Sequence, residues 1–410
     1  MINPFPLVWA IMRRHAVVCA TFVLLIALAV GIGAAITAQE RALRSGSARA
    51  ADKFDLIVGA PGSQIDLLLR VVFLQRGAVE LLSGEAERKL LSDTRAEFVA
   101  PIGFGDNYKG HPIVGTIPQL VLHLSGDQLA EGRNFETPFE AVVGSGSGLK
   151  VGETFHAAHG AEESPEAEGA LGGDHGHEQA ITVVGRMAPT GTPWDRAVLT
   201  PIELTWIVHE LGTGHGAETG TRIGPPFDLA TVPGIPAAVV KPATVAAAYG
   251  LRSEYRATDS TAFFPAEVLV QLYGLIGDVR VVMSALAIAT EVLLVAAILA
   301  GILMLMRLYR QRFAVLRALG ASRTYVLAVA WSFSFGLIAL GSVLGLGVAA
   351  ALVGVVSGLF SDASGIAMTT SIGWPEVWLA LGLAAIGAVL SILPAALLYR
   401  RPVVEALRSA

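Results

Sequence analysis

Four histidines are the residues of this sequence whose type and spacing could support metal chemistry. His156 and His159 are three residues apart, and His175 and His177 are separated by a single glycine. Imidazole nitrogens at such short spacings suit zinc, copper or nickel, and neighbouring acidic residues can add oxygen ligands. The sequence therefore contains a candidate metal site at these four positions.

The segment that holds most of these histidines has the composition of a solvated loop. Residues 157–179 are rich in Glu, Gly and Ala and contain one large apolar residue, Leu171. A loop of this kind rarely supplies the surrounding hydrogen bonds that orient the ligands of a catalytic metal. Two interpretations stay open: a hydrophilic insertion whose histidines are incidental, or a weak or regulatory site for zinc.

No other pattern organises residues for catalysis. Residues 144–150 (GSGSGLK) are similar to a phosphate-binding loop, but such a loop has lysine directly after the last glycine and then serine or threonine. Here Leu149 intervenes and Val151 follows the lysine. No HExxH or GxSxG motif occurs in the sequence. We therefore expect a non-catalytic protein that binds no cofactor of its own.

A cationic, half-apolar segment lies between two long apolar stretches. Residues 308–323 read LYRQRFAVLRALGASR, and their apolar residues fall largely on one face of a helix. Gly320 is where we expect this helix to end. Taken alone, the segment fits either a helix lying on lipid or a helix that docks into a partner protein.

Four apolar stretches are long enough to cross a bilayer as helices. The chain of 410 residues is 53% hydrophobic and only 15% charged, and a span needs about 20 apolar residues. The first stretch is longer than the apolar core of a signal peptide, roughly 7–15 residues, so we favour an uncleaved anchor. The predicted spans are residues 16–38, 281–306, 325–360 and 377–399.

The placement of arginine predicts the orientation of these spans. Residues 1–15, 307–324 and 400–410 carry arginines, whereas the segment between the last two spans has no lysine or arginine. By the positive-inside rule both termini and the 307–324 segment face the cytoplasm, and residues 39–280 lie outside. The single cysteine, Cys19, falls in the first span, so no disulfide can form within one chain.

The outside segment is expected to be an α+β domain. It holds 30 of the 34 acidic residues but 19 of the 29 basic ones, and an acidic exterior argues against binding nucleic acid. We expect its first residues, 39–53, to form a helical or flexible stalk. Short apolar runs that end in glycine are typical of strands, and longer apolar patterns are typical of helices. The sequence therefore predicts strands at residues 55–59, 141–144 and 181–185. It predicts helices at residues 65–74 and 78–91.

Two features inside the spans predict contacts between helices. Gly341 with Gly345, and Gly354 with Gly358, are pairs of small residues four positions apart, which lets helix backbones approach closely. Glu291 lies about eleven residues into the second span, where a carboxylate is costly in lipid and should face protein or water. A structural hydrogen bond to a neighbouring helix is favoured for Glu291 over a role with a proton or substrate.

Several of these stretches resemble one known family. Residues 313–323 (FAVLRALGASR) resemble the segment between the second and third spans of FtsX-like ABC transporter permeases, which include MacB-like exporters and lipoprotein-releasing permeases. The C-terminal residues 401–408 (RPVVEALR) are similar to that family's ending, and residues 54–63 and 190–197 resemble a MacB-like periplasmic core. One span, a large outside domain and three further spans is also the layout of that family. Arg312 departs from it, because family members usually have an acidic residue just before the apolar run.

The resemblance implies that residues 307–324 form a coupling helix that touches a separate cytoplasmic ATPase subunit, which would carry ATP and Mg²⁺. It implies a homodimer or a pair of permeases in the bacterial inner membrane, with the large domain in the periplasm, where it could meet a periplasmic protein. Nucleotide-driven closure would then move the outside domains. The residues assigned to the ATPase contact are Arg310, Arg312, Phe313, Val315, Leu316, Arg317, Leu319 and Gly320.

Two functions of other kinds stay open from the sequence. The histidine-rich loop fits a zinc-linked transport or sensing module. The layout also fits an FtsX-type transmitter that passes a signal across the membrane to a cell-wall enzyme without transport.

Overall fold

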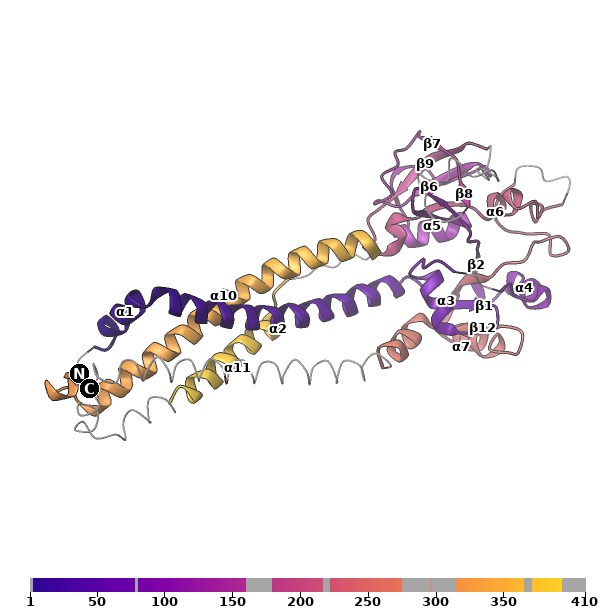
Figure 1. Ribbon diagram of the computed structural model, residues 1–410. Coiled ribbons are helices and arrows are strands. Elements are labelled where there is room, and N and C mark those ends of the chain that lie inside the picture. Colours follow the sequence, from indigo (N-terminus) through magenta and orange to yellow (C-terminus); the bar gives the residue numbers. More distant parts are fainter. Residues whose placement is uncertain are drawn as a thin grey trace, which may run out of the picture. The chain divides into compact units, whose positions relative to one another are not determined.

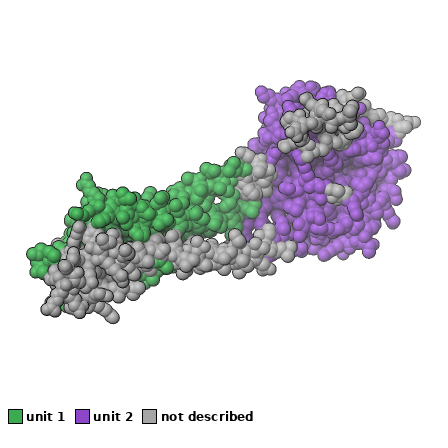
Figure 2. Space-filling view, viewed as in Figure 1, with its two compact units in different colours: residues 1–43, 277–359, 369–410 green, residues 44–276, 360–368 purple. Residues whose placement is uncertain are grey.

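The computed structural model describes residues 3–77, 80–159, 179–216, 222–274, 296, 315–364 and 371–392 (Figure 1). The chain divides into two compact units, coloured separately in Figure 2. The first, which we call the helical unit, comprises Met1–Leu43, Gly277–Leu359 and Thr369–Ala410. The second, which we call the mixed unit, comprises Arg44–Ile276 and Phe360–Met368.

The helical unit takes most of its described residues from four helices. They are α1 (Phe5–Arg14), α2 (Ala16–Ala51), α10 (Arg323–Ser364) and α11 (Trp374–Leu390). By length and apolar composition α2 and α10 can cross a bilayer, whereas α11 is apolar but shorter. The predicted span 281–306 lies outside the described residues, apart from Ala296, which is helical. The expected number of four spans is therefore not confirmed.

Two helix boundaries in this unit differ from the sequence prediction. The N-terminal residues contain a separate helix, α1, whose Val8 and Ile11 are three residues apart and are both buried in the unit's core. The predicted stalk 39–53 is not a separate element, because α2 continues as one helix to Ala51. The alanines and arginines of that stretch are strong helix formers, so nothing ends the helix where the apolar composition stops.

The mixed unit contains one antiparallel sheet in the order β12-β1-β11-β2. Its central strand β1 is buried along its whole length and pairs with β11, with Leu56 opposite Val240. Because β1 has neighbours on both sides and buried residues throughout, it reads in the sequence as a continuous apolar run. The strands are β1 (Leu56–Gly59), β2 (Ala96–Ile102), β11 (Ala237–Pro242) and β12 (Thr261–Phe263).

A second, mixed sheet has the order β5-β9-β6-β10-β4-β3-β8, with β7 pairing to β9. The pairs β6–β9 and β10–β4 are parallel, and the others are antiparallel. The strands are β3 (Asp106–Tyr108), β4 (His111–Thr116), β5 (Leu129–Gly132), β6 (Glu140–Val143), β7 (Thr154–Phe155), β8 (Ala158–His159), β9 (Ile181–Met187) and β10 (Val198–Pro201). Two sheets with intervening helices confirm the expected α+β class of this domain.

Short helices connect these strands. They are α3 (Gln64–Val71), α4 (Gly84–Leu91), α5 (Pro118–Ser125), α6 (Ile202–Val208) and α7 (Val245–Glu254), with a 3-10 turn η2 (Pro193–Arg196). The helix predicted from residue 78 begins only at Gly84. Ser83 caps it by accepting a hydrogen bond from the Ala86 amide, and just before it the Leu82 amide donates to the Ile235 carbonyl at 2.8 Å. That backbone pairing holds Leu82 extended and prevents an earlier start.

Two stretches far apart in sequence meet in the core of the mixed unit. Trp194, from residues 190–197, is fully buried, and its ring centroid lies 5.8 Å from that of Phe54, which precedes β1. The indole Nε1 donates to the Val71 carbonyl at 3.2 Å, at the end of α3. The Asp195 carboxylate accepts from the Thr190 and Gly191 amides and fixes the turn that delivers Trp194. The sequence motifs 54–63 and 190–197 are therefore joined by one aromatic contact.

Glu87 on α4 is a buried acid in the mixed unit. Its side chain is 2% exposed, and among the described residues its Oε1 has no hydrogen-bond partner. Burial raises the pKa of Glu87 to about 7, opposed by the charge of Arg88. The folded protein thus keeps a proton on Glu87 at pH values where the unfolded chain has released it.

We expect this proton to make the stability of the mixed unit depend on pH. As pH rises from about 4 to about 8, the free energy of unfolding should fall by about 2 kcal/mol through Glu87, because the unfolded chain ionises first. Glu87→Gln should remove this component, and Glu85→Gln, at an exposed position of the same helix, should not. Denaturant unfolding of the full chain at several pH values measures it; identical pH profiles for the two variants would contradict the assignment.

Candidate functional site

The described part of the arginine-rich segment presents two apolar side chains to solvent. Residues 315–318 are helical, and the Leu319 amide donates to the Val315 carbonyl at 2.9 Å. Val315 is 49% exposed and Leu319 is 80% exposed. Positions four apart in a helix lie on the same face. Val315 and Leu319 therefore form one exposed apolar patch, which we call the docking pair.

Leu316 lies between these two residues in sequence but packs inwards. It contacts the buried core of the helical unit, a cluster that includes Val8 and Ile11 of α1 and Val326 of α10. The same short turn is thus anchored to the helical unit by one leucine and exposes a second. Sequence periodicity placed Val315, Leu316 and Leu319 in one apolar group. It did not show that Leu316 packs inwards while the other two face solvent.

The turn ends in a defined reversal into α10. Gly320 has φ +98°, a conformation that glycine adopts without strain. The Gly320 amide donates to the Arg317 carbonyl at 3.1 Å, and the Ala321 amide to the Leu316 carbonyl at 3.0 Å, the pattern of a Schellman cap. Ser322 then accepts from the Tyr325 amide at 3.2 Å as α10 begins. Only this hydrogen-bonded reversal, Gly320–Ser322, consequently separates the docking pair from the first residue of α10.

Close packing joins α10 to α2 at the first pair of predicted small residues. A Cβ on Gly341 would lie 2.6 Å from the Ile26 Cβ, and one on Gly345 would lie 2.7 Å from the Val30 Cβ. Such distances are too short for any other residue without moving a helix. A Cβ on Gly354 or Gly358 would meet nothing within 4 Å, so the second pair makes no comparable contact among the described residues.

The structure also contains polar contacts between helices that the sequence reading missed. Arg41 of α2 donates to Glu376 of α11 at 3.0 Å and to the Ser371 carbonyl at 2.7 Å. The Glu376 carboxylate is fully buried and also accepts from the Gly373 amide, which caps α11. These two residues stand just beyond the predicted ends of two spans. Their opposite charges, both on the predicted outer side, were the signal that could have paired them.

Several predicted site residues lie wholly or partly outside the described residues. Arg310, Arg312, Phe313, Glu291, His175 and His177 are among them. His156 is exposed, and the backbone of His159 lies in β8, opposite Asp106 of β3. In the part of the chain that the structure describes, no three His, Cys, Asp or Glu side chains gather to hold a metal. Zinc binding by the histidine-rich loop stays a prediction.

Residues 282–403 match the family model described as FtsX-like permease C-terminal. This part of the chain is similar to FtsX-like permeases. The match includes the docking pair, the reversal at Gly320 and all of α10 and α11. It confirms the resemblance of this C-terminal part of the chain to FtsX-like permeases. No curated protein sequence matches the chain.

Two of the solved structures similar to this chain are extracytoplasmic regions of transporters. One is the periplasmic region of MacB from Actinobacillus actinomycetemcomitans, which is 12% identical, with 55% of this chain and 95% of that one covered and a TM-score of 0.32. Another is the extracellular domain of the noncanonic ABC-type transporter YknZ from Gram-positive bacteria, which is 9% identical, with 51% and 98% covered and a TM-score of 0.28. At these scores the likenesses carry no functional argument.

The glycine contact between α2 and α10 predicts a position-specific loss of stability. Gly341→Val should destabilise the helical unit by about 1–3 kcal/mol, because the added carbons overlap Ile26 and force the helices apart. Gly354→Val makes the same change on the same helix, where a Cβ meets nothing within 4 Å, and should be tolerated. The thermal unfolding midpoint of the detergent-solubilised full chain measures both. Equal decreases in the unfolding midpoint for the two variants would show that the contact between Gly341 and Ile26 does not determine the stability of the helical unit.

Proposed function

We propose that this chain is the transmembrane permease subunit of an ABC transporter of the FtsX and MacB type. The observation that carries the proposal is the family match over residues 282–403. The exposed docking pair beside a rigid reversal into α10 supports it, because an apolar patch on a defined turn suits a protein partner better than water. The chain is proposed to be non-catalytic, with ATP and Mg²⁺ bound by a separate ATPase subunit.

The contacts of the helical unit suggest how movement is passed on. An ATPase that pulls on Val315 and Leu319 would move α10 directly, because only the Gly320–Ser322 reversal separates them. The close approach at Gly341 and Gly345 would carry that movement to α2. The Arg41–Glu376 ion pair links α2 to the start of α11, so the three helices would shift together rather than slide past one another.

We further propose that the protein lies in the bacterial inner membrane with both termini in the cytoplasm and the mixed unit in the periplasm. It would act as a homodimer or with a paired permease, each bound to an ATPase, and the mixed unit could meet a periplasmic protein. In this mechanism ATP hydrolysis moves the periplasmic domains, and the substrate is driven outside the membrane instead of through a polar channel.

Changing the docking pair should release the ATPase. Leu319→Asp places a charge in the centre of the proposed apolar contact, and we expect the amount of co-purified ATPase subunit to fall at least about tenfold. Val245→Asp, at a position of the mixed unit that is 76% exposed, is the matched control and should leave association unchanged. Retention of the ATPase by the Leu319→Asp permease would count against the proposed contact.

The proposed orientation is testable with single cysteines, because Cys19 is the only natural one. In a Cys19→Ser background, Ala318→Cys should react with a membrane-impermeant maleimide only when the cytoplasmic side is accessible. Val245→Cys should react from the opposite side. Labelling of both positions from the same side would overturn the assigned topology.

A further inference from the structure

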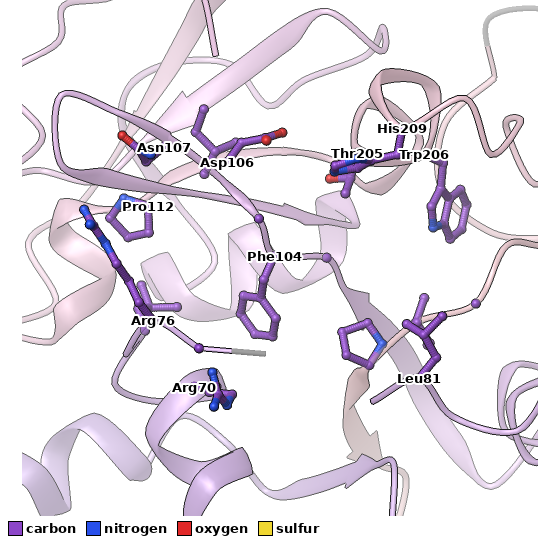
Figure 3. Close-up of a pocket in the computed structure, with 18 of the residues that line it drawn as sticks. Arg70, Arg76, Leu81, Phe104, Asp106, Asn107, Pro112, Thr205, Trp206 and His209 are labelled. Carbon is purple, nitrogen blue, oxygen red and sulfur yellow. The ribbon is translucent and has the colours of Figure 1, made fainter. Parts of the chain in front are cut away.

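A cavity of about 590 Å³ lies within the mixed unit (Figure 3). It is formed by α3 and the residues that follow it, the turn between β2 and β3, α6, and the residues leading into β11. Pockets of this size hold small organic molecules. None of the residues that line this cavity belongs to the docking pair or to the contacts between helices.

Apolar and aromatic side chains form much of the cavity wall. Trp206 is buried, and its ring is held edge-on by Phe227 at 5.6 Å between centroids. Phe104 is half-buried and packs against the main core of the mixed unit. Leu81 and Ile235 complete this surface. Because Trp206 and Phe104 are each supported from behind, the wall is a fixed apolar surface for a ligand.

The charged residues that line the cavity are mostly cationic. Arg70 and Arg76 line it together with His209, and Asp106 is the one acidic residue among the described lining residues. In Figure 3 Arg70 and Arg76 lie at the lower left of the view, Phe104 lies near the centre with Asp106 above it, and Trp206 and His209 lie at the upper right. The cavity therefore has a cationic end close to an aromatic wall.

Arg70 is the residue that points to a ligand. Its Nη1 is inaccessible to solvent and has no hydrogen-bond partner among the described residues. The guanidinium lies so close to Gly77 that a Cβ at that position would overlap it. A buried cationic donor without an acceptor is costly. An anionic group entering the cavity would remove that cost.

We propose that this cavity binds an amphiphilic carboxylate, with the carboxylate on Arg70 and the apolar chain along Phe104 and Trp206. The planar guanidinium fork matches a carboxylate, and the aromatic wall gives an alkyl chain apolar surface to cover. A bare inorganic anion would leave the apolar side chains of Phe104 and Trp206 in contact with water. A neutral hydrocarbon would leave Arg70 without an acceptor. Binding does not require the proposed transport function and is measured without the ATPase.

Octanoate is the probe, titrated by calorimetry into the full chain in a nonionic detergent, with 1-octanol as its uncharged counterpart. We expect saturable octanoate binding at one site per chain, and 1-octanol binding at least about tenfold weaker, since it lacks the carboxylate to which Arg70 would donate. Arg70→Gln should weaken octanoate binding at least about tenfold. Arg88→Gln, an exposed arginine on α4 that does not line the cavity, should have no effect.

Three results would overturn the proposal: no saturable binding of octanoate, equal binding of octanoate and 1-octanol, or an Arg70→Gln affinity equal to that of the unaltered protein. The comparison of the two ligands uses the unaltered chain and so remains informative if the variant folds poorly. Arg70→Lys, which keeps the charge, should recover part of the affinity. None of these outcomes bears on ATPase association, so the transport proposal and this one can fail separately.

Discussion

The close approach of α2 and α10 is the contact on which the mechanical interpretation of the helical unit depends. Inside a bilayer, lipid tails are as apolar as leucine, so two helices are held together by tight packing and by hydrogen bonds between them. Gly341 and Gly345 leave room for Ile26 and Val30, and Gly31 in turn faces Val348. Any larger residue at these glycines would separate the helices. In the proposed mechanism, the close packing at these three positions would help to carry a movement of α10 to α2.

Local patterns in the sequence predicted those strands and helix ends whose conformation depends on residues close by in the chain. The apolar runs at 55–59 and 181–185 correspond to β1 and β9, and glycine at 320 marks the end of the helical turn. The start of α4 could not be read in the same way, because the backbone bond between Leu82 and Ile235 that precludes an earlier start joins residues far apart in sequence. Composition allowed a helix in residues 39–53, but it did not show that this stretch continues α2 without a break.

In the candidate site, too, features set by nearby residues were predictable, and contacts between residues far apart in the sequence were not. The arginine-rich segment was recognisable from its composition, but the opposite directions of Leu316 and Leu319 follow from contacts with α1 and α10. The ion pair of Arg41 with Glu376 joins residues more than three hundred positions apart. Sequence spacing cannot supply such a contact. The motif around Trp194, by contrast, was visible in the sequence, and the structure gives it a packing role in the core.

The unbroken length of α2 determines how far along the chain a movement of this helix could be transmitted. A helix of 36 residues extends for about 54 Å at 1.5 Å per residue, whereas the hydrocarbon layer is about 30 Å thick. Nearly half of such a helix would extend beyond the hydrocarbon layer. Its backbone amides remain hydrogen-bonded to carbonyls of the same helix. No break interrupts the helix between Ile26 and Ala50, so in the proposed mechanism a displacement imposed near Ile26 would be carried along α2 to the residues that lead into β1.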